Sequence, residues 1–198
     1  MMKSVLLGAA AALTVAAPAQ AVPADFKAKA DALLKQSFPD AGPGAAVIVT
    51  EHGKPVYEGG QGLADIDAKT KITPATVFRI GSITKQFSAA SMLQLVAEGK
   101  VALDDKLSKY LPDYPKPGAD ATIAQLLNHT VGVQSYTGIP GWMAGDKPAK
   151  AYSTEELIAE FKDMPSPSKP GEKWDYNNSG YVLVGAVIEK ATGKPWYV

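Results

Sequence analysis

Hydrophobic and polar residues follow helical spacing in some parts of the chain and form strand-like runs in others. Near the start, residues 24–36 carry apolar side chains at the spacing of one helix face, which predicts a helix. Apolar runs follow at residues 44–50 and 54–60, and the short polar segment between them predicts a hairpin turn. Beyond residue 81 the spacing predicts helices at residues 82–98, 122–128, 153–163 and 179–192.

The order of these elements predicts the fold class. Strands come first and helices follow, which favours an α+β fold in which an antiparallel sheet is flanked by helices and an all-helical region is inserted. Because a two-stranded hairpin is marginal alone, this sheet needs further strands or a covering helix. The chain ends on an apolar segment, residues 194–198, after a predicted helix stop at Gly193. We therefore expect the fold to be incomplete at the C-terminus, truncated before its last strands.

The first 21 residues predict a signal peptide. Lys3 gives a positive start, residues 5–17 form an uncharged apolar run, and Ala19-Gln20-Ala21 is a small-x-small cleavage site. The run is shorter than the ~20 residues that a membrane-spanning helix needs. We expect cleavage after Ala21, no membrane span, and a mature domain at residues 22–198 that is periplasmic or secreted. The alternative is a buried N-terminal helix.

Composition excludes several classes of function. The 198 residues carry 20 Lys and Arg against 20 Asp and Glu, so the chain lacks the basic surface that a nucleic-acid partner requires. Without Cys there is no thiolate nucleophile, disulfide or Cys-based metal site. Asp65 and Asp67 could form a carboxylate metal site, but two acids are far short of a calcium ligand set. We expect neither a metal nor another cofactor.

The candidate nucleophiles are serines, and Ser-x-x-Lys occurs twice. The copy from Ser166 to Lys169 lies among prolines, where no helix can place both side chains on one face. The copy at Ser82 and Lys85 opens a predicted helix, in which residues three apart are neighbours. The helix start also favours developing negative charge. The alternative is that Ser82 only caps the helix.

Other residues bear on whether Ser82 is a nucleophile or a helix cap. The Gly-x-Ser-x-Gly elbow that accompanies Ser-His-Asp triads is absent, so we expect His52 and His129 to be structural or solvated. A Tyr-x-Asn sequence at Tyr176 and Asn178 stands between a Pro- and Gly-rich loop and a predicted helix. Its side chains can project into a cleft from a fixed support. The alternative is an N-cap cluster for that helix.

As a set, these motifs resemble the serine β-lactamase and penicillin-binding-protein superfamily. The similarity is strongest to class C β-lactamases and their esterase and D-amino-acid peptidase relatives. The matching segments are the early hairpin and residues 78–85, 126–133 and 170–181, in matching order and spacing. Two departures stand out. Val131 occupies a position where this group usually has Ser, and the third motif, Lys-Thr-Gly or His-x-Gly on a later strand, is absent.

The resemblance implies a serine hydrolase that forms an acyl-enzyme on a β-lactam, a D-amino-acid peptide or an ester. Ser82 would be the nucleophile, Tyr176 would relay its proton to the leaving group, and Asn178 would bind the substrate amide or orient Lys85. Since Lys85 and Tyr176 can share one proton, either can be the formal base.

A different class of function stays open. The chain could be a non-catalytic binding module, or an inactive fragment, that keeps the pocket for recognition. In either case the expected partner is a small molecule or peptide, and the missing C-terminal half of its own fold is a further candidate partner.

Overall fold

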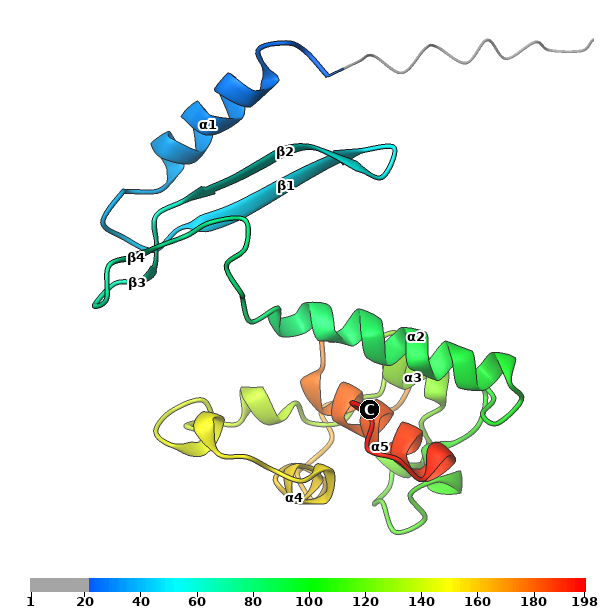
Figure 1. Cartoon of the computed structure of the whole chain (residues 1–198). Coiled ribbons are helices and arrows are strands. Elements are labelled where there is room, and N and C mark those ends of the chain that lie inside the picture. The colour runs from blue at the N-terminus through cyan, green and yellow to red at the C-terminus, as the bar shows by residue number, and fades with distance from the viewer. Residues whose placement is uncertain (1–21) are drawn as a thin grey trace, which may run out of the picture. The chain divides into compact units, whose positions relative to one another are not determined.

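The structure, a computed structural model, describes residues 22–198. The predicted signal peptide lies outside the described residues. The chain divides into two compact units, with the boundary between Arg79 and Ile80 (Figure 1).

The first unit contains one helix and four short strands. Helix α1 (Phe26–Ser37) is followed by β1 (Ala45–Glu51) and β2 (Lys54–Gln61), which pair antiparallel as the sequence predicts. The second pair, β3 (Leu63–Asp65) and β4 (Thr70–Lys71), is also antiparallel. These strands of three and two residues are too short to show an alternating pattern, so the sequence does not predict them.

Helix α1 and strand β2 are joined through the buried side chain of Tyr57. Its ring meets Phe26 edge to face at 6.1 Å between centroids, and its hydroxyl donates a 2.8 Å hydrogen bond to Asp31. The β1–β2 turn places His52 and Gly53 at φ values of 49° and 76°. This left-handed turn closes the predicted hairpin.

The second unit is helical (Figure 1). Its α-helices are α2 (Thr84–Ala97), α3 (Ile123–Leu127), α4 (Thr154–Ala159) and α5 (Asn178–Thr192). Its 3-10 helices are η1 (Gly81–Ile83), η2 (Leu107–Lys109), η3 (Gly118–Asp120), η4 (Tyr136–Gly138) and η5 (Lys147–Ala149).

Helix α5 lies at the centre of this unit and contacts α2, α3 and α4. Its side chains Leu183, Val184 and Val187 are fully buried. The start of α5 is capped by Asn177, whose Oδ1 accepts the backbone N–H of Gly180 at 2.8 Å. Its end is the predicted helix stop at Gly193, where φ is 70°. A fixed start matters because Tyr176 and Asn178 flank this cap.

Helix α4 is shorter than the predicted helix at residues 153–163. A capping box between Ser153 and Glu156 fixes its start, as the sequence favours. After Ala159 the backbone tightens into single turns, in which Phe161 N–H donates to Ile158 O. The apolar spacing continued past the helix because Phe161 is buried in the core and not because the helix continues.

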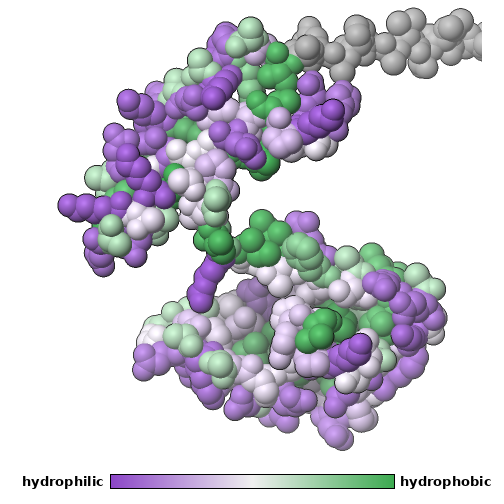
Figure 2. All heavy atoms as spheres, viewed as in Figure 1, coloured by the Kyte–Doolittle hydropathy of each residue, from purple (hydrophilic) through white to green (hydrophobic). Residues whose placement is uncertain are grey.

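Helix α2 is apolar on more than one side. Met92 and Leu95 are buried against the core, whereas Phe87 and Leu93 are 63% and 50% exposed. Figure 2 shows hydrophobic residues on the visible face of this unit. A helix that is apolar around its circumference is typical of the interior of a protein.

The predicted fold class is therefore confirmed, with helices and small antiparallel sheets along the described chain. Between residues 22 and 198, no helix has both the length and the apolar character needed to cross a bilayer.

Candidate active site

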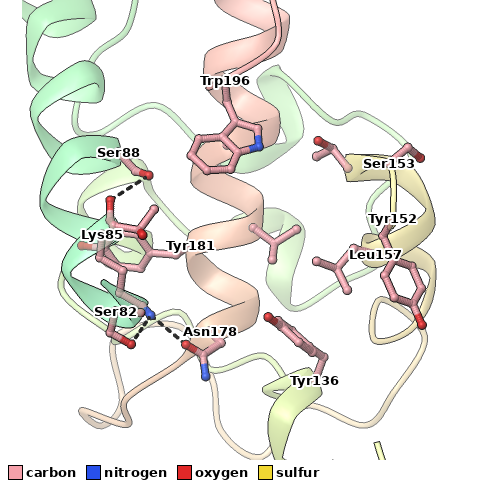
Figure 3. Close-up of a pocket in the computed structure, with 15 residues that line it drawn as sticks. Ser82, Lys85, Ser88, Tyr136, Tyr152, Ser153, Leu157, Asn178, Tyr181 and Trp196 are labelled. Carbon is pink, nitrogen blue, oxygen red and sulfur yellow. Dashed lines mark hydrogen bonds between the residues drawn. The ribbon is translucent and has the colours of Figure 1, made fainter. Parts of the chain in front are cut away.

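Ser82 and Lys85 lie at the start of helix α2. Ser82 belongs to the 3-10 helix η1 and Lys85 to the first turn of α2. Gly81 precedes them with a φ of 51°, a left-handed conformation that glycine adopts without steric cost. Lys85 Nζ donates a hydrogen bond of 3.3 Å to Ser82 Oγ (Figure 3). Ser82 and Lys85 are therefore in contact, as their three-residue spacing predicts.

Tyr176 lies 94 positions after Ser82 in the sequence and completes this cluster. Its hydroxyl lies 2.7 Å from Ser82 Oγ, and the two hydroxyls are hydrogen bonded. Lys85 Nζ lies 4.8 Å from the centroid of the Tyr176 ring. The three residues predicted to be catalytic are therefore in mutual contact.

Asn178 fixes the position of the Lys85 ammonium. Its Oδ1 accepts a 2.7 Å hydrogen bond from Lys85 Nζ (Figure 3). Its Nδ2 donates to Thr137 Oγ1 at 2.8 Å, and its backbone N–H donates to Ser135 Oγ at 3.2 Å. Of the two roles expected for Asn178, this geometry matches orientation of Lys85. Its contact with substrate stays a prediction.

The surroundings favour ionisation of Tyr176. Hydrogen bonds with Lys85 and then Ser82 lower the pKa of its phenol, and the positive charge of Lys85 lowers it further. Lys85 itself is held by Asn178 and lies over two aromatic rings, those of Tyr176 at 4.8 Å and Tyr181 at 5.5 Å. Electron-rich ring faces attract an ammonium group. The cluster therefore suits a cationic lysine beside a phenol that loses its proton easily.

The two capping alternatives have different outcomes. At the starts of η1 and α2 no side chain makes a capping hydrogen bond, so the Ser82 hydroxyl does not act as a cap. At α5 the capping residue is Asn177, whose amide also donates to Val133 O at 2.7 Å. The capping interpretation is therefore right for Asn177, and this cap leaves Tyr176 and Asn178 free to face Ser82 and Lys85.

A pocket of about 430 Å³ opens beside Ser82 (Figure 3). Its far wall is largely apolar and aromatic, and comes from Tyr136, Tyr152, Leu157, Val182 and Trp196. Gly185 allows the close approach of the Trp196 ring, since a Cβ there would lie 3.3 Å from it. Among the described residues that line the pocket, Lys85 is the one charged side chain.

Several residues that hold the cluster in place were not predicted from the sequence. Ser135 and Thr137 anchor Asn178, and Tyr181 lies beside Lys85. His129, expected to be structural or solvated, contacts the ring of Tyr176 at 4.6 Å between centroids. Ser135 and Thr137 closely follow the segment 126–133, and this position in the chain is the one sequence signal for them. Nothing in the spacing indicates the contact of His129 with Tyr176.

The other candidate site residues named in the sequence analysis do not belong to this cluster. Ser166 and Lys169 belong to an irregular segment, as the prolines predict, and Ser166 lines a different pocket from Ser82. The Asp65 carboxylate accepts the N–H of Ala68 in a turn. Within residues 22–198, no three His, Asp or Glu side chains gather in an arrangement that could hold a metal ion.

The Val131 departure has a structural explanation. Val131 is fully buried within the apolar core, and its Cγ1 would lie 3.2 Å from a Cβ at Gly180. An apolar side chain fits this position without an unsatisfied polar atom.

The chain is similar to known proteins in sequence and in fold. Esterase EstB of Burkholderia gladioli is 33% identical over 185 residues, which are 87% of this chain and 47% of that protein. The octameric penicillin-binding protein homologue of Pyrococcus abyssi is 34% identical, with a TM-score of 0.70 over 85% of this chain and 39% of that one. The D-amino acid amidase of Ochrobactrum anthropi SV3 is 33% identical, with a TM-score of 0.63 over 77% of this chain and 40% of that one.

The chain therefore spans less than half the length of each of these relatives. The family model for Beta-lactamase matches residues 30–197, which include every residue of the cluster. The chain belongs to the Beta-lactamase family, whose relatives named here include hydrolases of esters and amides.

Proposed function

We propose that this protein is a serine hydrolase that forms an acyl-enzyme on Ser82. The observation that carries the proposal is the 2.7 Å contact between the hydroxyls of Tyr176 and Ser82, with Lys85 Nζ at 3.3 Å from the same Ser82 oxygen. A serine hydroxyl becomes a good nucleophile only when a neighbouring base takes its proton. The relatives include an esterase and an amidase, which supports the reaction class.

In the proposed acylation, Tyr176 is the base and Lys85 remains an ammonium. Tyr176 as phenolate takes the Ser82 proton while Ser82 Oγ forms a bond to the substrate carbonyl carbon. The tetrahedral intermediate then collapses, the bond to the leaving group breaks, and Tyr176 returns the proton to that group. The lowered pKa of Tyr176, caused first by its hydrogen bond with Lys85, supports this assignment.

Deacylation uses the same groups in reverse. Tyr176 takes a proton from water, the water oxygen bonds to the acyl carbon, and the bond to Ser82 Oγ breaks as Tyr176 returns the proton to that oxygen. The backbone N–H of Ser82 lies in the first turn of η1, where N–H groups lack helical partners. We propose that it donates to the developing oxyanion.

The lining of the pocket disfavours a cationic acyl group. Its far wall offers aromatic and aliphatic contacts, and no carboxylate lines it among the described residues. The preferred substrate is therefore an ester or amide with an apolar or aromatic acyl group. A cationic acyl group would meet Lys85 and find no counter-ion there.

A covalent probe tests the nucleophile. A fluorescent β-lactam and an alkyl fluorophosphonate are each incubated with the 198-residue chain, and the adduct is mapped by peptide mass spectrometry. One adduct at Ser82 is expected, with none in Ser82→Ala and full labelling in Ser166→Ala. Equal labelling of the parent and Ser82→Ala would overturn the mechanism. Probe binding that stays reversible would support a binding module instead.

We also propose that the protein is exported. The Lys3 start, the apolar run and the cleavage site at Ala19-Gln20-Ala21 support a signal peptide. N-terminal sequencing of the protein from the extracytoplasmic fraction is expected to begin at Val22. Intact Met1 on the folded protein in the cytoplasm would contradict export.

A further inference from the structure

His129 holds the backbone on both sides of Tyr176. Its carbonyl oxygen accepts the N–H of Asp175 at 2.9 Å. Its imidazole Nδ1 accepts the N–H of Asn177 at 3.1 Å. The two donors are the backbone N–H groups of the residues before and after Tyr176, so one histidine holds the chain on both sides of the phenol.

The imidazole ring also contacts the Tyr176 side chain. The two ring centroids are 4.6 Å apart with an interplanar angle of 34°, and the ring of Tyr181 lies on His129 at 5.2 Å and 36°. Tyr181 is fixed in turn by a 2.9 Å hydrogen bond from its hydroxyl to Leu127 O. If the imidazole were displaced, the Tyr176 ring would therefore lose this aromatic contact.

This arrangement requires a neutral imidazole. Nδ1 can accept the Asn177 N–H only through its lone pair, so the ring proton must be on Nε2. In a protonated ring, Nδ1 carries a hydrogen that faces the N–H of Asn177, and the hydrogen bond is lost. His129 also adopts a φ of 64°, a conformation that few side chains tolerate.

The charges near His129 favour the neutral form. From α2, the ammonium of Lys85 faces the ring, and burial followed by this charge lowers the pKa of His129. The phenol rings of Tyr176 and Tyr181 also contact the imidazole. The nearby carboxylate of Asp175 lies 3.7 Å from its own cation, Lys173.

We propose that His129 is the positioning residue for Tyr176: its neutral imidazole holds the phenol against Ser82, and protonation of the ring releases the phenol and slows acylation in acid. This inference rests on the proposed function of Ser82 and Tyr176. His129 takes no proton from the substrate in this scheme, so its effect runs entirely through Tyr176.

Nuclear magnetic resonance tests the protonation state without any substrate. The chain has two histidines, so His52→Asn leaves His129 as the single imidazole. Long-range nitrogen–proton spectra near neutral pH are expected to show a proton on Nε2 and none on Nδ1. Titration is expected to give a pKa below the ordinary value of about 6.5. A proton on Nδ1, or a charged ring at neutral pH, overturns the inference.

Two substitutions separate the hydrogen bond from the ring contact. His129→Asn tolerates the left-handed backbone and offers an amide oxygen to the Asn177 N–H, whereas His129→Phe keeps a ring and loses the acceptor. Acylation of Ser82 by the fluorophosphonate is expected to slow on the order of tenfold to a hundredfold in the Phe variant and less in the Asn variant. His52→Phe, at a φ of 49° in the hairpin turn, is the matched control for backbone strain and is expected to acylate at the parent rate.

The pH profile gives a result that a purely structural role would not. In the parent, acylation is expected to fall as His129 gains its proton, in addition to the fall from Tyr176. In His129→Asn the component at the His129 pKa is expected to vanish while acylation persists. An unchanged profile in that variant overturns the inference.

A further measurement separates this inference from the proposed function. Tyrosinate absorbance is titrated in the parent and in His129→Phe, each against the same protein with Tyr176→Phe. Displacement of Tyr176 from Lys85 is expected to raise its pKa in the His129 variant. If no protein acylates, the proposed function fails, and the tautomer and this titration still decide the role of His129.

Discussion

The Lys85 ammonium and the Asn178 side-chain carbonyl are joined by a hydrogen bond of 2.7 Å, across 93 positions of sequence. This bond links the first turn of α2 to the first turn of α5. Lys85 has four rotatable bonds, so its contact with Ser82 depends on such a fixed partner. Asn178 therefore controls where the charge beside the nucleophile lies.

The first prediction follows from this bond. Asn178→Ala is expected to slow acylation of Ser82 roughly 10- to 100-fold, because Lys85 loses its anchor. Thr137→Val is expected to cause a smaller loss, since it removes only the 2.8 Å support of the Asn178 amide. Second-order acylation rates with the fluorophosphonate measure both effects. A parent-like rate in Asn178→Ala would show that Lys85 is positioned without it.

The second prediction concerns pH. The pKa of Tyr176 is lowered, so its phenolate appears at lower pH than for an ordinary tyrosine, and acylation is expected to rise as pH rises through that value. Lys85→Met removes the main cause of the shift, which is the hydrogen bond with Lys85. It is expected to raise the pKa of Tyr176 and to move the rise in rate to higher pH. Rate profiles with tyrosinate absorbance measure both, and an unmoved profile would favour a different base.

The cluster could be predicted from the sequence because each of its two halves is a short motif within a few residues of chain. The spacing of Ser82 and Lys85 encodes their approach on one helix turn. Tyr176 and Asn178 stand on either side of a helix cap, whose sequence signal is Asn177. How these two ends come together was not readable from spacing, and the resemblance to a known superfamily supplied that step.

The parts that the sequence did not predict depend on tertiary contacts. Strands β3 and β4 are too short for a periodic pattern, and α4 ends early while buried Phe161 prolongs the apolar spacing. The contact of His129 with Tyr176 arises between a turn after α3 and a loop before α5, so no local rule indicates it.

The third prediction concerns stability in acid. The Asp105 carboxylate accepts hydrogen bonds from Lys109 Nζ at 2.8 Å, Tyr110 Oη at 2.6 Å and the Ala102 N–H at 2.8 Å. These bonds, that of Lys109 first, lower the pKa of Asp105 from 3.8 to about 2. Because the folded-state pKa is depressed, the stabilisation is complete above about pH 4 and is lost as pH falls toward 2.

Asp105→Asn is therefore expected to lower the free energy of unfolding by about 1–2 kcal/mol near neutral pH, and by much less near pH 2. Urea unfolding at the two pH values measures the difference. The exposed neighbour Asp104 supplies the control, and Asp104→Asn is expected to change little at either pH. An equal loss for Asp105→Asn at both values would contradict the role of the ionised carboxylate.

The fourth prediction uses the departure at Val131. Val131→Ser introduces the residue usual in the superfamily at a position that is fully buried among apolar side chains. The hydroxyl has to be buried there and two methyl groups are lost, so the free energy of unfolding is expected to fall by about 1–3 kcal/mol. The acylation rate at Ser82 is expected to stay at the parent value, because Val131 packs on Gly180 and contributes no polar atom to the cluster. Val77→Ser, at a position that is 95% exposed, is the control and is expected to leave stability unchanged. If Val131→Ser were as stable as the parent, its hydroxyl would have to find a hydrogen-bond partner in this core. Val and Ser at residue 131 would then be equally compatible with the fold.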